Sequence, residues 1–545
     1  MAPPRGRLRP VSGGWRGAVG GRPRAWFVEG VLSGMHPADF VINPIPNALE
    51  RDRSRVIVEM AGGRAWTGGE MIDAMSTLSH ALRLHGGCDG ARVALLAGNS
   101  VEVLLVESAI RFAGAVLVSL HPMGSAEDHA FAVEDAGVEV LVFDPAKFAK
   151  RALELRACSP GLTAALALGP SEIGVDVLAE AATLRPERVV TPDLDPSSTI
   201  KLAYSGGTTG RPKAIPLSPR GYAACLQTML MDWEWPVEPR VLAVAPLSHA
   251  GGSLFPTMLL KNGTMVILPA FEPGAVLRAI QEHRITCTML VPTMIYALLD
   301  HPDFDRYDLS SLETVFYGAS LMSPVRLKEA IERIGPVFFQ FYAQTEAPMV
   351  VFMLRKSEHD PNDPRRLSSC GRPTAWLDVA LLDGGDQAVE DGKPGEICVR
   401  GPLVMDGYLN QPELTEETFS GGWLHTGDVA VKDEDGFYRI VDRKKDMIVS
   451  GGFNMFPSEI ENVIAQHPAV AQVSVFGTPD DKWGEAVTAA VVLRPGESVG
   501  ADALREMVRD RKGPMQSPKR VEFLAAIPQT AVGKPDKKAL RLLFA

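Results

Sequence analysis

Paired cysteines are missing from this sequence. Only six cysteines occur in 545 residues, and no two of them form a CxxC pair. Scattered single cysteines indicate neither a zinc site nor a disulfide framework. We therefore expect a protein of a reducing compartment, the cytoplasm.

Long uninterrupted hydrophobic runs are also missing. The segment Val101–Leu120 comes nearest to the length of a membrane span, but Glu102, Glu107 and Arg111 interrupt it. We interpret it as a core helix followed by a buried strand, and we expect no membrane span. Residues 1–25 carry six arginines and no acidic residue, but they lack the apolar centre of a secretory signal. This segment is expected to be a disordered tail, or the result of a start codon placed too early.

An excess of positive charge is the third absence. Lys and Arg number 55 against 66 Asp and Glu, and the formal net charge is -11 at pH 7. Broad contact with nucleic-acid phosphates needs clustered basic residues, so we expect no nucleic-acid partner.

A single core stops growing at roughly 250 to 300 residues, so a chain of this length predicts two or more domains. Composition does not determine the oligomeric state, so a homo-oligomer is left as an alternative to a monomer.

The order of apolar segments predicts an α/β protein. Short β-branched or aliphatic runs alternate with longer helical stretches such as 275–283, which favours parallel-rich sheets covered by helices. Asp435-Gly436 lies between two apolar runs and predicts a hairpin turn. The charged run 442–446 follows, and the residues after it can fold as a small α+β unit. We predict a large domain over 26–441 and a small mobile C-terminal domain over 442–545.

The segment from Ser205 to Lys213 reads Ser-Gly-Gly-Thr-Thr-Gly-Arg-Pro-Lys and is the most informative in the chain. Glycines let backbone N–H groups converge on an anion, hydroxyls add donors, and the lysine adds positive charge. The composition suits a polyphosphate. It is not a Walker A loop, because the lysine lies three positions past Gly210 and a strand is expected to follow. Taken alone, the segment could also be a polar hairpin loop without a ligand.

This loop resembles the phosphate loop of the adenylate-forming superfamily, which contains acyl-CoA synthetases, peptide-synthetase adenylation domains and beetle luciferases. Further motifs of that superfamily follow in the expected order: Pro246-Leu-Ser-His249, Tyr317-Gly-Ala-Ser320, Tyr342-Ala-Gln-Thr-Glu346, Gly371-Arg-Pro373, Gly395-Glu396, Thr426-Gly-Asp428, 442–452 and Gly533-Lys534. The resemblance runs from about residue 45 to the C-terminus. Within the superfamily, the sequence resembles actinobacterial fatty-acid and specialised-metabolite acyl-CoA ligases. It implies a ligase that uses ATP, Mg2+ and coenzyme A to convert a carboxylic acid into a thioester through an acyl-adenylate.

The resemblance also implies the nucleotide-binding residues. Tyr342 would stack on adenine, Asp428 would accept hydrogen bonds from the ribose hydroxyls, and Arg443 would contact ribose and phosphate. Thr345 would contact the α-phosphate. The full expected set is Ser205, Gly206, Gly207, Thr208, Thr209, Gly210, Lys213, Gly318, Ala319, Ser320, Tyr342, Ala343, Thr345, Asp428, Ile440 and Arg443.

By the same resemblance, four residues carry the chemistry. Lys534 would bridge the reacting carboxylate and the α-phosphate and so stabilise charge that develops in the transition state. Lys213 and Thr209 would hold the triphosphate. Glu346, with Thr209, would bind the magnesium ion, because a hard carboxylate suits a hard cation. A helix-start carboxylate is the alternative interpretation of Glu346.

The remaining positions concern domain movement and the two acyl partners. Lys445 occupies the hinge position of the family, and Ser450, Gly451 and Gly452 would shape the coenzyme A tunnel. The expected acyl pocket consists of His249, Phe255, Tyr317, Pro348 and Met349. No aspartate stands in the His249 motif to hold a substrate amine, which favours a simple carboxylic acid over an amino acid. A bulky or polycyclic apolar acid is the expected kind of substrate.

Three positions depart from the family pattern: Gly206 replaces a common Ser, and Ala214 and Ala343 replace common glycines. A Cβ at Ala343 could crowd the nucleotide, so one alternative is an enzyme that only converts a supplied acyl-adenylate into its thioester. Transfer to a carrier-protein pantetheine, a luciferase-like oxygenase and a non-catalytic acyl-adenylate sensor are also compatible with these motifs. Retention of Lys534 disfavours the sensor, since a binding module has little use for a transition-state lysine.

Overall fold

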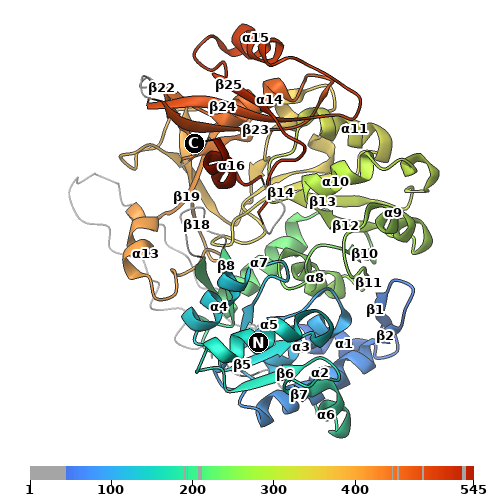
Figure 1. The fold of residues 1–545 in the computed structure, drawn as a ribbon. Helices are drawn as coiled ribbons and strands as arrows, with labels where there is room; N and C mark the ends of the chain where they lie inside the picture. The colour runs from blue at the N-terminus through green and yellow to red at the C-terminus, as the bar shows by residue number, and fades with distance from the viewer. Residues whose placement is uncertain are drawn as a thin grey trace, which may run out of the picture. The chain divides into compact units, whose positions relative to one another are not determined.

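The computed structural model describes residues 44–189, 192, 194–205, 212–444, 446–450, 453–480, 484–530 and 535–544. The chain divides into a unit of residues 1–40 and a unit of residues 41–545, and all described residues belong to the second. The predicted tail at 1–25 lies outside the described residues. Figure 1 shows the ribbon with its element labels.

A seven-stranded sheet forms the first half of the large N-terminal region. Its strands run in the order β7-β6-β5-β3-β4-β8-β9, and every neighbouring pair is parallel except β8 and β9. The bounds are β3 Arg92–Leu96, β4 Val116–Ser119, β5 Val140–Phe143, β6 Ala164–Ala167, β7 Val175–Asp176, β8 Lys201–Ser205 and β9 Lys213–Leu217. The alternation read from the sequence therefore does produce a mostly parallel sheet.

A nine-stranded sheet forms the second half, in the order β16-β15-β14-β13-β12-β10-β11-β1-β2. Its centre is parallel and its two ends are antiparallel. The bounds are β1 Val56–Met60, β2 Ala65–Thr67, β10 Arg240–Ala243, β11 Thr264–Ile267, β12 Cys287–Leu290, β13 Thr314–Gly318, β14 Phe338–Tyr342, β15 Phe352–Leu354 and β16 Arg372–Pro373.

Alternation along the central strands separates two cores. Phe316 of β13 packs in one hydrophobic cluster with Trp233 and Phe339, whereas its neighbour Tyr317 packs in another. Successive strand residues point to opposite faces, so a strand buried on both sides must carry apolar residues at consecutive positions. The second cluster lies under α9, α10 and α11, which run beside β12 and β13 in Figure 1.

Proline fixes where many helices start. Prolines stand at the first turn of nine of the helices given below, where a missing N–H costs nothing and the ring sets a helical φ. The helices are α1 Ile45–Arg51, α2 Gly68–Leu84, α3 Val101–Phe112, α4 Ala126–Asp135, α5 Pro145–Cys158, α6 Val177–Thr183, α7 Pro219–Asp232, α8 Leu254–Leu260, α9 Pro273–Glu282, α10 Pro292–Leu299, α11 Pro324–Ile334, α12 Pro364–Leu367, α13 Pro412–Thr418, α14 Pro457–Ile464, α15 Ala501–Lys512 and α16 Lys537–Phe544. Short 3-10 helices cover η2 Ala250–Ser253, η3 Phe304–Arg306, η4 Lys356–Glu358 and η5 Ser420–Gly422.

The segment Val101–Leu120 folds as predicted, since α3 is followed by the buried strand β4. Every described helix is either too short or too polar to cross a membrane. All six cysteines are free thiols.

A four-stranded antiparallel sheet follows, in the order β17-β18-β19-β20. Its strands are β17 Asp378–Leu382, β18 Pro394–Arg400, β19 Leu424–Lys432 and β20 Tyr438–Arg443. The predicted turn at Asp435-Gly436 joins β19 to β20, and Gly436 has φ +80, a conformation that favours glycine. This hairpin carries three of the expected nucleotide-binding residues, Asp428, Ile440 and Arg443.

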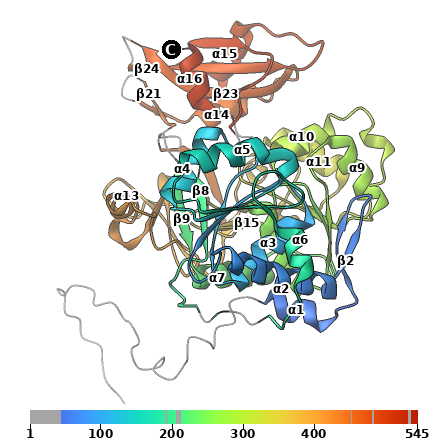
Figure 2. The same ribbon diagram turned by 60° about the horizontal axis from the view of Figure 1, so that its bottom comes forward.

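The C-terminal region has a sheet and a core of its own. Strands β21 Ile448–Ser450, β22 Phe453–Met455, β23 Val470–Asp480 and β24 Gly484–Leu493 are antiparallel, and β25 Arg520–Phe523 pairs with β24 in parallel. A hydrophobic cluster drawn only from residues 448–521 lies against this sheet. Figure 2 shows α14, α15 and α16 gathered around it. This is the small α+β arrangement that the sequence predicted.

Candidate active site

The phosphate-loop segment joins two strands of a hairpin. Ser205 and Lys213 are directly paired at the end of β8 and the start of β9. The expected loop residues Gly206, Gly207, Thr208, Thr209 and Gly210 lie outside the described residues. The Lys213 ammonium lies 5.0 Å from the ring centre of Tyr408, a cation–π contact that holds the lysine beside the next element of the site.

Glu346 lies in the loop after β14, not at the start of a helix. Its Oε1 accepts a hydrogen bond of 2.9 Å from the Tyr408 hydroxyl, so the same tyrosine contacts both Lys213 and Glu346. Burial and the neighbouring carboxylate raise the pKa of Tyr408, and the phenol stays protonated as a donor. Thr345 is exposed and Ala343 is half-buried in the same loop.

The Asp428 carboxylate contacts three other side chains of the site. Its Oδ2 accepts hydrogen bonds of 2.6 Å from both the Tyr342 hydroxyl and the Gln344 amide. Its Oδ1 pairs with Arg443 Nε at 3.0 Å, across the β19–β20 register that places the two residues opposite each other. The charge of Asp428 raises the pKa of Arg443, and burial together with this carboxylate raises the pKa of Tyr342 well above its usual value.

Gln344 is a site residue that the sequence reasoning missed. It occupies the variable position of the Tyr342–Glu346 motif, and its amide also donates to the Thr426 carbonyl at 2.9 Å. It therefore ties the loop after β14 to the turn before Asp428. A polar amide at that position was the available signal.

Gly318, Ala319 and Ser320 come at the carboxyl end of β13, beside the end of β14 where Tyr342 lies. A Cβ at Gly318 would collide with the Phe341 carbonyl, and Ala319 adopts φ +66. Parallel strands bring their carboxyl ends to one edge of a sheet, which is where α/β proteins bind ligands. The structure thus brings this turn and Tyr342 together.

The structure describes only some of the other expected site residues. Ile440 of β20 pairs with Ala430 and is half-buried against the main core. Ser450 is buried at the end of β21. Lys445, Gly451, Gly452 and Lys534 lie outside the described residues.

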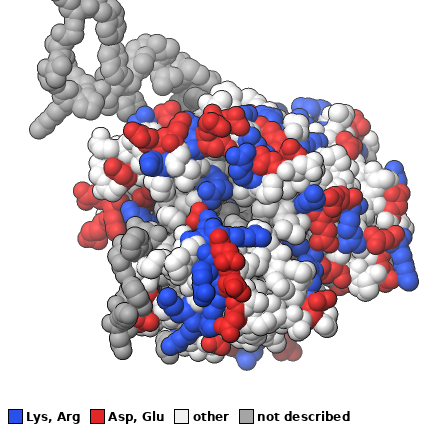
Figure 3. Space-filling model, turned by 90° about the horizontal axis from the view of Figure 1, so that it is seen from above, with Lys and Arg blue, Asp and Glu red and all other residues white. Residues whose placement is uncertain are grey.

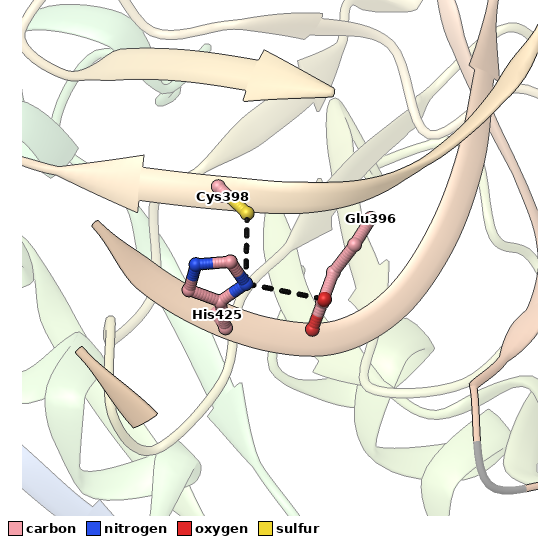
Figure 4. A group of neighbouring side chains, drawn as sticks. All are labelled: Glu396, Cys398 and His425. Carbon is pink, nitrogen blue, oxygen red and sulfur yellow. Dashed lines mark hydrogen bonds and ion pairs between the residues drawn. The ribbon is translucent and has the colours of Figure 1, made fainter. Parts of the chain in front are cut away.

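Glu396, Cys398 and His425 form a hydrogen-bonded group (Figure 4), and Glu396 connects it to the Thr426-Gly-Asp428 turn. Glu396 of β18 accepts from the Gly427 amide at 2.9 Å, contacts His425 Nδ1 at 3.1 Å and pairs with Lys444 at 3.1 Å. Cys398 Sγ lies 3.4 Å from the same His425 nitrogen. Glu396 belongs to a quoted motif, but the sequence alone did not reveal its role as a support for the turn.

Glutamate, cysteine and histidine are also metal-ligand types, and their ligand atoms here lie within 4.8 Å of one another. Two features favour a hydrogen-bond network instead. The Glu396 carboxylate is already paired with the Lys444 ammonium. Burial, together with nearby Glu396, raises the pKa of the Cys398 thiol to about 12.

Three of the five expected acyl-pocket residues line one cavity. Phe255, Pro348 and Met349 bound a space of about 710 Å³, part of which is open to solvent, between α3, α7 and α8. His249 lies outside the lining, where it packs edge-on against His121 at 4.5 Å. Burial, His121 and Lys201 hold the pKa of His249 well below its usual value.

Tyr317 also lies outside that cavity. It is fully buried in the second core, where its hydroxyl is 2.9 Å from His359 Nε2 and its ring meets Phe338. The pleat of β13 directs Phe316 to the first core and therefore Tyr317 to the other side. This placement corrects the expectation that Tyr317 bounds the acyl pocket.

Comparison with known proteins assigns this arrangement to a family. The model for "AMP-binding enzyme" matches residues 46–409, and the model for "AMP-binding enzyme C-terminal domain" matches residues 459–534. The chain belongs to the AMP-binding enzyme family. Within this family the enzyme is 49% identical to the medium/long-chain fatty-acid–CoA ligase FadD8 of Mycobacterium tuberculosis, over 91% of this chain and 89% of that protein.

Other relatives of this AMP-binding enzyme act on different acids or acceptors. It is 36% identical to a feruloyl-CoA synthase of an Amycolatopsis species, over 89% of this chain and 95% of that protein. Among solved structures, the amide bond synthetase McbA of Marinactinospora thermotolerans superposes with a TM-score of 0.84 and 35% identity, covering 92% of this chain and 99% of that one.

Proposed function

We propose that this AMP-binding enzyme is an acyl-CoA ligase that uses ATP to join a carboxylic acid to coenzyme A through an acyl-adenylate. One observation supports the proposal most directly: charged side chains from separate segments meet in two groups. Tyr408 contacts both Lys213 and Glu346. Asp428 contacts both Tyr342 and Arg443. Two basic and two acidic groups arranged in this way suit a nucleotide triphosphate and its metal ion.

The residues present fit a magnesium ion. One oxygen of Glu346 is held by Tyr408, and the other accepts no hydrogen bond from the described residues. An oriented carboxylate with a free oxygen suits Mg2+, which takes oxygen ligands and retains waters. Glu346 would hold the ion together with Thr209, and when bound it would neutralise charge on the phosphates.

The first step forms a bond between a carboxylate oxygen of the acid and the α-phosphorus and releases pyrophosphate. Lys213 would offset charge on the leaving pyrophosphate, and Lys534 would stabilise the charge that develops between carboxylate and α-phosphate. Asp428 and Tyr342 would orient the ribose and adenine so that this attack is in line. In the second step the thiol sulfur bonds to the acyl carbon, the thiol proton is lost, and AMP leaves.

The two steps would use two positions of a C-terminal domain over 442–545. The separate core of residues 448–521 supports such a domain, and Lys445 is the proposed hinge. One position would present Lys534, and the other would present Ser450, Gly451 and Gly452 to coenzyme A.

The charged surface in Figure 3, where Lys and Arg lie interspersed with Asp and Glu, suits an enzyme of small charged molecules more than a nucleic-acid binder.

The test is a screen of carboxylic acids with ATP, Mg2+ and coenzyme A, in which the thioester is detected by mass. A thioester that requires all three reagents supports the proposal. Absence of product with every acid, and also with synthetic acyl-adenylates, would refute it.

Two further arms separate the competing functions. Pyrophosphate exchange of ordinary strength with the best acid would exclude an enzyme limited to the second step by Gly206 and Ala343. Replacing coenzyme A with a holo-carrier protein decides which pantetheine is the acceptor. A cytoplasmic location and a possible homo-oligomer are part of the same proposal.

A further inference from the structure

Four polar side chains line the otherwise apolar cavity described above. Glu107 and Arg111 come from α3, Lys201 from β8 and Tyr222 from α7. The other side chains of the lining are apolar except for two serines. Pro348 and Met349 follow Glu346 closely in the chain, so the wall they form is near the nucleotide-binding residues, and the polar group comes from other elements.

The polar group is buried and incompletely paired. The side chains of Glu107, Arg111 and Lys201 are 11%, 14% and 15% exposed. Arg111 Nη2 lies 4.0 Å from Glu107 Oε2 and Lys201 Nζ lies 3.8 Å from Glu107 Oε1, both beyond hydrogen-bond distance. Lys201 instead donates to the Ser248 carbonyl at 3.2 Å, and the Arg111 guanidinium lies over the Tyr222 ring at 4.7 Å.

Three buried atoms of this group have no hydrogen-bond partner among the described residues: Glu107 Oε1, Arg111 Nε and Tyr222 Oη. Burying such groups without partners is unfavourable, so a ligand that satisfies them gains binding free energy. Glu107 Oε1 can only accept, Arg111 Nε can only donate, and Tyr222 Oη can do both. A hydroxyl group both donates and accepts, whereas a ketone or a second carboxylate offers nothing to Glu107.

We propose that this acyl pocket selects a carboxylic acid that carries a hydroxyl group away from the reacting carboxylate, held by Glu107, Arg111 and Tyr222. The inference rests on the proposed ligase function, because it assigns the specificity of that same site. Phe255, Met349 and the other apolar residues of the lining would surround the hydrocarbon part of the acid.

The experiment compares acids that differ only in oxygen substitution. Straight-chain acids from hexanoic to dodecanoic acid are measured beside their ω-hydroxy acids and the dicarboxylic acids of the same length. Phenylpropanoic acid is measured beside its 4-hydroxy derivative. For the length or ring that fits, we expect kcat/KM of the hydroxy acid to exceed that of the plain acid by about 10- to 100-fold.

A matched pair of tyrosine variants tests the contact. Tyr222→Phe removes the phenol oxygen but keeps the ring beside Arg111, and we expect it to lower kcat/KM for the hydroxy acid by about 10-fold and to change that of the plain acid much less. Tyr307→Phe is the control, because Tyr307 is half-buried in the second core and its hydroxyl has no side-chain bond among the described residues. Glu107→Gln, which keeps the shape of the side chain, should also reduce the hydroxy-acid preference. Circular dichroism and the thermal midpoint establish that each variant is folded.

The outcomes are distinguishable. Equal kcat/KM for plain and hydroxy acids in every pair would overturn this inference and leave the ligase function intact, since water would then satisfy the three atoms. A preference for dicarboxylic acids would also overturn it, because the group would then recognise negative charge. Absence of thioester from every acid would refute the ligase function itself.

Discussion

Replacement of Glu396 by glutamine is expected to loosen the turn that carries Asp428. Glu396 is 8% exposed, and its carboxylate receives the Gly427 amide, the His425 ring and the Lys444 ammonium. A glutamine keeps the shape and one acceptor oxygen. Its NH2 group would, however, face the Lys444 ammonium, and the negative charge would be lost.

The size of the effect follows from these three contacts. The bond to Gly427 can persist in the variant. The pair with Lys444 contributes no more than about 1 kcal/mol, because the Lys444 side chain is 61% exposed. The contact with His425 is buried, and hydrogen bonds to charged groups contribute about 1.5 to 3 kcal/mol. We therefore expect Glu396→Gln to lower the free energy of unfolding by about 2 kcal/mol at pH 7, and to raise the KM for ATP through the misplaced turn.

The pH dependence gives a second, sharper expectation. Burial alone would raise the pKa of Glu396, but the bonds from His425, Lys444 and Gly427 outweigh it and hold the pKa below its usual value. A carboxyl group with a lowered folded pKa contributes stability above its unfolded pKa, about 4.3, and loses that contribution as the pH falls through the folded value. The difference between wild type and variant should therefore shrink between pH 5 and the acid limit of folding.

Urea unfolding at a series of pH values measures this difference. Glu434→Gln is the matched control, because Glu434 is exposed in the turn of the same β19–β20 hairpin. The reasoning fails if Glu396→Gln and Glu434→Gln unfold at the same urea concentration at pH 7. It also fails if the gap between wild type and Glu396→Gln does not change with pH.

Three other outcomes follow from the site. Lys534→Ala should reduce pyrophosphate exchange by about 100-fold or more if the lysine acts, as proposed, in the adenylation transition state, while thioester formation from a synthetic acyl-adenylate should change far less. Equal losses in both assays would contradict the proposed role. Tyr408→Phe should lower kcat/KM for ATP by about 5- to 30-fold, since Glu346 loses the hydrogen bond that orients it. The Mg2+ concentration needed for half-maximal activity should rise. An unchanged Mg2+ dependence would count against Glu346 as a ligand. Burial raises the pKa of Asp442 to about 6, so ionisation of this group destabilises the folded state. The Asp442→Asn variant should therefore gain up to about 3 kcal/mol of stability relative to wild type as the pH rises from 4 to 7. A pH-independent difference in unfolding free energy would contradict this.

Much of the fold was predictable because local patterns decided it. The hairpin turn at Asp435-Gly436, the interrupted run at Val101–Leu120 and the alternation of apolar strands with helices each depend on neighbouring residues only. The structure has each of these elements. Strand order across the two large sheets was not predictable, since it depends on pairings between residues far apart in sequence.

In the site, the nucleotide-binding residues were easier to identify from the sequence than the residues of the acyl pocket. Tyr342, Asp428 and Arg443 were identified through motifs, and the structure places all three in contact. Tyr317 illustrates the limit of the method. Because β13 is buried on both faces, its pattern of consecutive apolar residues does not indicate which face meets the acyl cavity. The polar amide of Gln344 was a signal in the motif, but its partners Asp428 and Thr426 lie far away in sequence and could not be read from it.

The contacts of Arg443 and Lys444 restrict where the proposed hinge could lie. Arg443 is held to Asp428, whose side chain is only 5% exposed, and both belong to the β19–β20 ladder. A rotation starting before Arg443 would break that pair and the ladder with it. A rotation starting after Arg443 breaks the exposed Lys444–Glu396 pair, which contributes little, and the 2.8 Å hydrogen bond from the Lys444 amide to the Gly427 carbonyl. It must also open the bond from the Ser458 amide to the Asp442 carboxylate, across the proposed hinge. Because burial raises the pKa of Asp442 to about 6, a movement that exposes this carboxylate at pH 7 regains solvation of its charge, which offsets part of the cost of opening the contact.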